Sequence, residues 1–190
     1  MNFVEPIRDV KKIDAIKRLL NNKRDVLIFT MGINSALRVS DLLKLTIGDV
    51  LDSSRKIRVS IILKEKKTDK TKIFPLNESV KKELKAYLAE RGEVKDDEPL
   101  FPSRNSQKGQ RALGRIQVWS IFNSVARLVG LSNIGTHTLR KTFGYHVYKN
   151  SGGNLGLVQK LLNHSSSGDT LRYIGIDREQ MDNAYLELNL

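Results

Sequence analysis

The segment LLNHSSSGDTLRY, residues 161–173, places a histidine and a tyrosine at the two ends of a short polar turn. An apolar helical pattern leads into His164, and the Ser/Gly/Asp run behind it is typical of a helix end followed by a new helix start. An imidazole can transfer protons near neutral pH, and a phenol can act as an oxygen nucleophile. A buried histidine beside a packed tyrosine is the ordinary alternative, so this segment alone does not establish chemistry.

Cationic side chains at three other places could bind an anion. In HTLR, His137 and Arg140 are three positions apart, which puts both on one face of a helix. Arg38 lies in an otherwise apolar segment, NSALRVSDLL, where a guanidinium normally has an anionic partner. Structural explanations stay open for each group: a solvated basic helix, a surface pair between Arg38 and Asp41, and a charged hairpin tip that protects a strand edge. The hairpin lysines are Lys64, Lys66, Lys67, Lys70 and Lys72.

The composition narrows the class of partner. The chain has 33 Lys and Arg residues against 21 Asp and Glu, a formal net charge of +12, which favours a polyanion. No apolar run approaches the roughly 20 residues that span a bilayer, and no segment is an isolated basic amphipathic helix, so nucleic acid is preferred to a membrane. Without cysteine, disulfides and thiolate metal sites are excluded. The N-terminus lacks a signal-peptide pattern, and we expect a cytoplasmic, nucleoid-associated protein.

The elements that must position these residues are mostly helices. The length and a hydrophobic content of 39% suit one α+β domain, mainly α-helical, with a small antiparallel β-hairpin. β-branched residues predict a strand over 56–63 and a short partner over 72–76, with a polar tip between them. Ser40 and Asp41 can begin a helix, and 48–54 is a turn-rich link. Other helices are predicted from apolar periodicity over residues 9–21, 26–33, 78–91, 116–130, 137–149, 154–162, 167–173 and 178–188.

In this order and context, the motifs resemble the catalytic domain of the tyrosine recombinase (phage integrase) family. The resemblance covers nearly the whole chain, from EPIRD near the start to the tail beyond Tyr173. Five ordered matches make it specific. They are the first-arginine motif ALRVSDLLKL, the hairpin-lysine motif KTDKTKIFPL, the strand-to-loop motif PLFPS, the HxxR motif HTLRKTFGYH and the histidine–tyrosine motif LLNHSSSGDTLRY.

The resemblance implies a site-specific DNA recombinase that cleaves and rejoins strands through a covalent 3′-phosphotyrosyl intermediate, without a metal or other cofactor. Tyr173 is the expected nucleophile, and two arginines are expected to stabilise the charge on the phosphorane transition state. The sequence does not divide proton transfer and phosphate binding between the two histidines. The expected catalytic residues are Arg38, Lys67, His137, Arg140, His164 and Tyr173.

The choice of Lys67 among the hairpin lysines also depends on the resemblance. In the family the catalytic lysine precedes the strand proline by eight positions, and here that proline is Pro75. Lys67 is therefore the expected general acid that protonates the leaving 5′ oxygen. Lys66 is its nearest competitor, because hairpins slip by one residue.

Double-stranded DNA is the expected partner, with a tetramer on two DNA sites during recombination, and a monomer is left open for the isolated chain. A Ser/Gly/Gln-rich basic loop over 103–115 and the hairpin tip supply many of the cations. The motifs do not specify the target sequence, accessory proteins, or the choice among integration, excision, inversion and resolution. The residues expected to bind DNA are Lys66, Lys70, Lys72, Arg104, Lys108, Arg111, Arg115 and Lys141.

The expected organisation is a single catalytic domain over residues 1–190, without the family's N-terminal DNA-binding domain. A tail helix is expected near 178–188, with an apolar face that docks either on its own core or on a neighbouring protomer. That face consists of Met181, Ala184, Tyr185 and Leu188.

Three other functions compete with this interpretation. A type IB topoisomerase would use similar residues and the same phosphotyrosine chemistry to relax supercoiled DNA, and a DNA-binding module without activity would use only the positive charge. A metal-dependent nuclease is disfavoured, because the three histidines lack a converging carboxylate cluster. The third of these histidines, His146, is assigned to packing of the helix that carries the HxxR motif.

Overall fold

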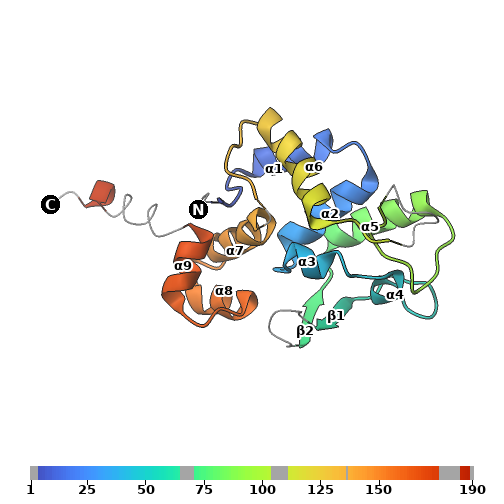
Figure 1. Ribbon diagram of the computed structural model, residues 1–190. Helices are drawn as coiled ribbons and strands as arrows, with labels where there is room; N and C mark the ends of the chain where they lie inside the picture. The colour runs from blue at the N-terminus through green and yellow to red at the C-terminus, as the bar shows by residue number, and fades with distance from the viewer. Residues whose placement is uncertain (1–3, 65–70, 104–110, 136, 176–184, 189–190) are drawn as a thin grey trace.

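Helix α2 (Lys23–Asn34) is the central element of the fold (Figure 1). The computed structural model describes residues 4–64, 71–103, 111–135, 137–175 and 185–188. Most side chains of α2 are buried, because the helix packs against both α5 (Glu78–Arg91) and α7 (Thr138–Asn150). The Asn22 side chain caps its start by accepting a hydrogen bond from the amide of Asp25.

The described residues form helices and one two-stranded antiparallel sheet, which confirms the predicted α+β class. Helix α5 ends at Arg91 and is followed by Gly92, whose φ of 76° favours glycine, so the predicted C-terminal cap is confirmed. The remaining elements are α1 (Val10–Leu19), α3 (Val39–Leu42), α4 (Ile47–Val50), β1 (Ser60–Lys64), β2 (Thr71–Pro75), α6 (Arg115–Leu128), α8 (Leu155–Leu162) and α9 (Ser167–Ile174).

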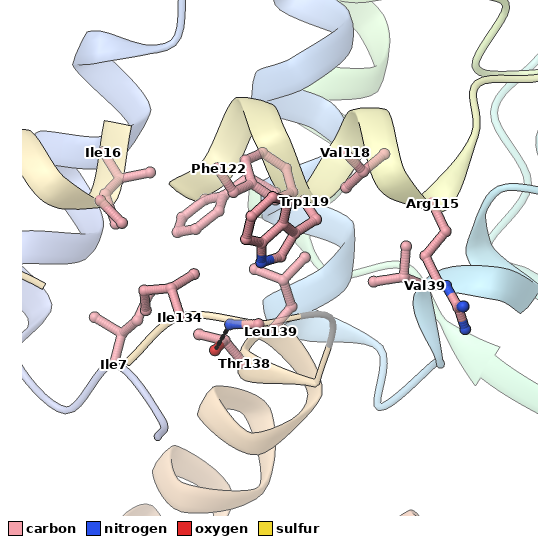
Figure 2. Close-up of a pocket in the computed structure, with 13 residues that line it drawn as sticks. Ile7, Ile16, Val39, Arg115, Val118, Trp119, Phe122, Ile134, Thr138 and Leu139 are labelled. Atoms are coloured by element: carbon pink, nitrogen blue, oxygen red, sulfur yellow. Dashed lines mark hydrogen bonds between the residues drawn. The ribbon is translucent and has the colours of Figure 1, made fainter. Parts of the chain in front are cut away.

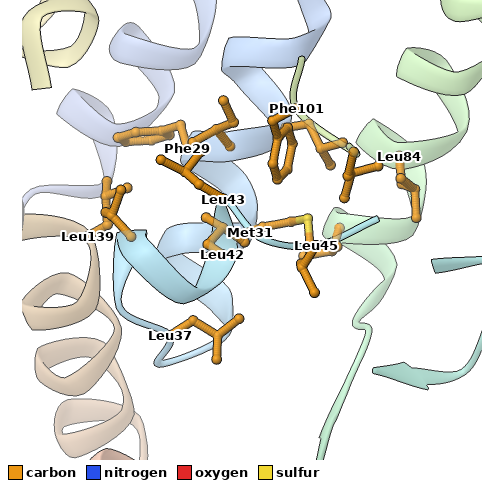
Figure 3. Close-up of a cluster of buried hydrophobic side chains, with 14 of the residues drawn as sticks. Phe29, Met31, Leu37, Leu42, Leu43, Leu45, Leu84, Phe101 and Leu139 are labelled. Carbon is orange, nitrogen blue, oxygen red and sulfur yellow. The ribbon is translucent and has the colours of Figure 1, made fainter. Parts of the chain in front are cut away.

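Figure 3 shows the apolar side chains that join α2 to its neighbours. Phe29 and Met31 of α2 are buried together with Leu42 of α3, Leu84 of α5 and Leu139 of α7. The contact between α2 and α7 is especially close, since a Cβ atom on Gly32 would lie only 2.5 Å from Leu139 Cδ1. This close approach brings the link after α2 next to the first turn of α7.

Two short features differ from the sequence-based expectations. Helix α4 lies where a turn-rich link was predicted; its buried residues Ile47 and Val50 join the core, and the Asp49 carboxylate accepts from the Thr46 amide at its start. Helix α3 begins at Val39, one residue before the predicted Ser40. Four-residue helices carry no periodic signal of their own, so tertiary packing decides their position.

The sheet is a single hairpin with one buried and one exposed cross-strand pair. Ile61 and Phe74 are buried opposite each other, whereas Ile62 and Ile73 are exposed on the other face. The sequence predicts the first strand from residue 56, but the strand begins at residue 60. The preceding residues instead pair with the segment that follows α4.

Helices α7, α8 and α9 pack around a second apolar cluster, which includes Tyr145, Val158 and Ile174. The ends of all three helices lie within one residue of the predicted limits. Gly144 lets α9 approach α7, because a Cβ atom there would lie 2.7 Å from Ile174 Cγ2 and 3.1 Å from Leu162 Cδ1. This packing brings the histidine–tyrosine motif close to the HxxR motif.

The predicted tail helix lies largely outside the described residues. Residues 185–187 are helical, and the side chains of Tyr185, Leu186 and Leu188 are exposed. Within the described ranges, no helix is both long and apolar enough to cross a membrane.

Candidate active site

An open pocket of about 540 Å³ contains most of the residues singled out by the sequence. Five of the six predicted catalytic residues line it, and Lys67 lies outside the described residues. These five come from the link between α2 and α3, from the first turn of α7, and from the α8–α9 region. They are Arg38, His137, Arg140, His164 and Tyr173.

Arg140 joins three of these segments. Its side chain is almost completely buried, with 2% of the residue exposed. One guanidinium nitrogen, Nη1, donates to the Ala36 carbonyl at 2.6 Å, and Nη2 donates to the Leu162 carbonyl. The planar guanidinium thus binds the α2–α3 link and the end of α8 at the same time. Arg140 therefore holds two walls of the pocket together and also supplies a positive charge to it.

Arg38 follows a strained turn. Ala36 has a φ of 54°, in the left-handed region that costs a residue other than glycine about 1 kcal/mol. Arg38 itself is half-buried and occupies the N-cap position of α3. The sequence left open a surface pair between Arg38 and Asp41, but Asp41 is only 3% exposed and belongs to the interior of this region. The apolar residues on both sides of Asp41 in the sequence are the feature that could have predicted this burial.

Tyr173 lies between the two predicted histidines. Its hydroxyl is 3.4 Å from Nδ1 of His137. The ring centroids are 6.3 Å apart for His137 and 4.8 Å for His164, and both imidazoles are nearly perpendicular to the phenol ring. On the far side of His164, Nδ1 is 3.2 Å from the hydroxyl oxygen of Thr170, a residue that the sequence did not single out.

Burial and positive charge set the protonation states of these rings. Burial raises the pKa of the Tyr173 phenol, and the charges of Arg140 and Arg38 oppose that shift. Burial lowers the pKa of both His137 and His164, and the same two arginines lower each further. All three rings are therefore uncharged near neutral pH in the protein alone. An approaching phosphate meets two guanidinium charges, one phenol and two neutral imidazoles.

Lys141 also lines this pocket, where it is largely buried beside the tyrosine. The residue is 8% exposed, and its Nζ atom is 5.1 Å from the centre of the Tyr173 ring, a cation–π distance. Burial lowers the pKa of this lysine. The sequence grouped Lys141 with residues that bind DNA, and burial was not visible there because it depends on how α9 packs over α7.

The other residues expected to bind DNA fall into two groups. Arg111 and Arg115 are exposed, and Arg115 is near enough to His137 for its charge to contribute to the lowered pKa of that ring. For Lys72, the structure describes the strand position in β2 but not the side chain. The residues that lie outside the described ranges are Lys66, Lys70, Arg104 and Lys108.

A second hollow contains almost no ionisable group. Figure 2 shows this narrow cleft, of about 20 Å³, between α1, α6 and the start of α7. Apolar side chains such as Ile7, Trp119 and Phe122 line it, with Arg115 at one end. Of these two hollows, only the polar pocket around Tyr173 contains several ionisable side chains.

The chain is similar to known integrases and recombinases. Residues 9–180 match the family model described as the phage integrase family. The chain is 43% identical over 187 residues to the probable integrase/recombinase YoeC of Bacillus subtilis, and the match covers 97% of each protein. It is 34% identical over 171 residues to the tyrosine recombinase XerC of Thermodesulfovibrio yellowstonii, covering 86% of this chain and 54% of that protein.

A solved structure shows the same fold. The XerH site-specific recombinase, in a post-cleavage complex with a palindromic difH substrate, matches with a TM-score of 0.73 and 26% identity. The match covers 96% of this chain and 51% of XerH. The chain thus spans nearly all of YoeC but about half the length of XerC and XerH.

Proposed function

The chain belongs to the phage integrase family of tyrosine recombinases, and we propose from that premise that its polar pocket cleaves and rejoins a DNA phosphodiester. The relatives are integrases and recombinases, which supports site-specific recombination over relaxation by a topoisomerase. The observation that carries the proposal is the position of the Tyr173 hydroxyl, 3.4 Å from a neutral imidazole in a pocket that two arginines line.

In the proposed step, the Tyr173 oxygen attacks the phosphorus atom and the bond to the 5′ oxygen breaks. The 3′ phosphate becomes joined to the tyrosine, and a 5′ hydroxyl is released. His137 Nδ1 accepts the phenol proton, since it is the imidazole nitrogen that lies 3.4 Å from that hydroxyl. Arg38 and Arg140 stabilise the negative charge that grows on the non-bridging oxygens.

The leaving 5′ oxygen needs a proton, and Lys67 is proposed as the acid on the strength of its place in the hairpin motif. The phosphotyrosyl bond conserves the energy of the original linkage, so attack by another 5′ hydroxyl reverses the step without ATP. The protein thereby joins strands with the same residues that cut them.

The proposed partner is double-stranded DNA, in the cytoplasm and at the nucleoid. The net charge of +12 favours a polyanion, and the related XerH was crystallised with its DNA substrate. Recombination between two sites requires four strand cuts, and we propose that four copies of this chain supply the four tyrosines.

The test is a covalent complex with a suicide duplex. The recognition site is first selected from random duplexes by binding, and then given a nick that lets the cut end diffuse away. Wild-type protein in excess chelator should give a protein–DNA band that survives denaturation. Tyr173→Phe should give none while binding persists, because the change removes one hydroxyl and no positive charge.

Tyr185→Phe is the matched control, since that tyrosine is 80% exposed and lies in the tail. It should cleave as the wild type does. A band that persists in Tyr173→Phe, or one that forms only when magnesium is added, would show that the proposed chemistry is wrong.

A further inference from the structure

His164 is held in place from two sides. Its amide donates to the Gln159 carbonyl at 3.0 Å, and its own carbonyl accepts from Gln159 Nε2 at 3.3 Å, so α8 fixes the backbone. The ring is fixed by α9, where Thr170 Oγ1 lies 3.2 Å from Nδ1. An imidazole held this firmly by one hydroxyl has its proton positions decided by what that hydroxyl can do.

The Thr170 hydroxyl has a second partner that limits its role. Thr170 is completely buried, and its Oγ1 is 2.9 Å from the carbonyl of Ser166, one turn earlier in α9. A carbonyl can only accept, so the single hydroxyl proton goes to Ser166. The remaining capacity of Oγ1 is as an acceptor, and His164 must then be the donor through Nδ1–H.

We infer that Thr170 is a positioning residue that holds His164 in the Nδ1–H form, so that every proton His164 gains or loses is carried by Nε2. His164 lines the polar pocket, and its Nε2 forms no hydrogen bond with the described residues. In the opposite tautomer the exchanging proton would lie on the Thr170 side, away from a bound phosphate. The inference rests on the proposed function, since it is a phosphate that would use the Nε2 proton.

The charged groups around His164 make this choice of nitrogen consequential. Burial and Arg140 lower its pKa, with a smaller contribution from Arg38, while Asp169 on α9 raises it. A neutral imidazole has only one N–H, and Thr170 takes it. Nε2 is then an acceptor until a phosphate arrives, whose negative charge favours protonation and converts Nε2 into a donor to a phosphate oxygen.

The tautomer can be read directly from the full chain. Two-bond proton–nitrogen correlation spectra of protein labelled with ¹⁵N-histidine distinguish Nδ1–H from Nε2–H, and the chain has only three histidines. A His164→Gln variant assigns the signal. Wild-type protein and Thr170→Ser should show Nδ1–H at a pH where the ring is neutral, whereas Thr170→Val, which has the same shape but no hydroxyl, should lose that preference.

Thr30→Val is the matched control. Thr30 is also completely buried, but its hydroxyl has no hydrogen-bond partner among the described residues, so the same change there should leave the His164 tautomer unaltered. An Nε2–H signal in the wild type, or an unchanged Nδ1–H signal in Thr170→Val, would overturn the inference. If Thr170→Val does not fold, the wild-type spectrum still tests the inference, because an Nε2–H signal there would overturn it.

The suicide duplex gives a second measurement. Thr170→Val should cleave about tenfold more slowly, the effect of losing roughly one hydrogen bond, while Thr170→Ser restores the rate and DNA binding is unchanged in both. Slower cleavage with an unaltered tautomer would mean that Thr170 has only a structural role. If the wild type forms no covalent complex at all, the proposed function fails, and the spectra still test the tautomer separately.

Discussion

At the scale of the residue, arginine at position 140 performs a task that lysine cannot. The Arg140 fork donates to the carbonyls of Ala36 and Leu162 from a buried position, and a single ammonium cannot reproduce that planar geometry. Arg140→Lys should lower the free energy of unfolding by about 1–3 kcal/mol, the cost of a buried acceptor left unsatisfied. The rate of cleavage of the suicide duplex should fall about 100-fold or more, because the negative charge on the non-bridging oxygens in the transition state loses a fixed hydrogen-bond donor.

The checks are thermal unfolding and the rate of the covalent step, with Arg18→Lys on the exposed part of α1 as the control. The control should match the wild type in both. If Arg140→Lys cleaves at nearly the wild-type rate, the proposed role of the Arg140 guanidinium in stabilising the transition state is wrong.

The two active-site histidines predict a stability that depends on pH. An unfolded histidine titrates near pH 6.5, whereas burial and the nearby arginines lower the folded pKa of both His137 and His164. Below about pH 6.5 the unfolded chain therefore binds more protons than the folded one. The free energy of unfolding should fall as the pH is lowered from 7.5 towards 5.5 and recover as it is raised.

Denaturant titrations at both pH values measure this slope. A double variant, His137→Gln with His164→Gln, should lose less stability over the same interval, because neither glutamine binds a proton. Equal losses in the wild type and the double variant would contradict the prediction.

The sequence predicts residue chemistry better than residue environment. Arg38, His137, Arg140, His164 and Tyr173 are identified by type and by motif order, and the structure brings these five into one pocket. The burial of Lys141 and the contact of Thr170 with His164 arise only when α9 packs over α7. A short motif contains no information about that packing, so the sequence did not predict the burial of Lys141 and gave Thr170 no role. The DNA-binding role of Lys141 stays a prediction, and this residue lines the polar pocket.

At the scale of the element, Gly144 determines how closely the tyrosine helix α9 approaches α7. A Cβ atom at this position would be 2.7 Å from Ile174 Cγ2, so Gly144→Ala must displace α9 or α8. Overpacking of this kind costs about 1–3 kcal/mol. We therefore expect a lower melting temperature. The covalent step should also be slower, because Ile174 is next to Tyr173 in the chain and its displacement moves the nucleophile, while DNA binding should be retained.

Gly168→Ala in the first turn of α9 is the matched control. No described atom lies within 4 Å of a Cβ atom there, and alanine favours a helix over glycine by about 0.5–1 kcal/mol. This variant should be as stable as the wild type or more so. If Gly144→Ala behaves like Gly168→Ala, the close packing of α9 is not needed for cleavage.

The most predictable elements were the helices with a clear apolar period. Apolar periodicity over three or four turns located α5, α6 and α7 to within a residue or two at most ends. Helix α4 and the start of β1 differed, because each is decided by contacts with distant segments and not by its own pattern. The strained turn at Ala36 is another such feature, since its left-handed φ has no glycine to announce it.

At the scale of the whole molecule, the pocket joins the two apolar clusters of the fold. Arg38 follows the larger cluster around α2, whereas Tyr173 packs on the smaller cluster of α7, α8 and α9. Arg140 donates to the carbonyls of Ala36 and Leu162, and the side chains of both residues belong to the smaller cluster. The chain passes from Ala36 in the smaller cluster directly to Leu37 in the larger one. The Arg140 fork therefore holds the segment that carries Arg38 next to the cluster that carries Tyr173.

The tail provides a prediction about assembly. Tyr185 and Leu188, the described members of the expected apolar face, are 80% and 68% exposed, so this part of the face is not covered by the chain's own core. A helix with an uncovered apolar face needs a partner, and a second copy of the chain is the partner that the proposed recombination by four copies would supply. Deletion of residues 178–190 should leave the melting temperature measured by circular dichroism unchanged. It should reduce the assembly of several copies on site-containing DNA, measured by sedimentation, while a single suicide site is still cleaved.

A control variant, Glu187→Gln, changes the tail's charge but not its apolar face and should assemble normally. A lower melting temperature with unchanged assembly would instead show that the tail docks on its own core.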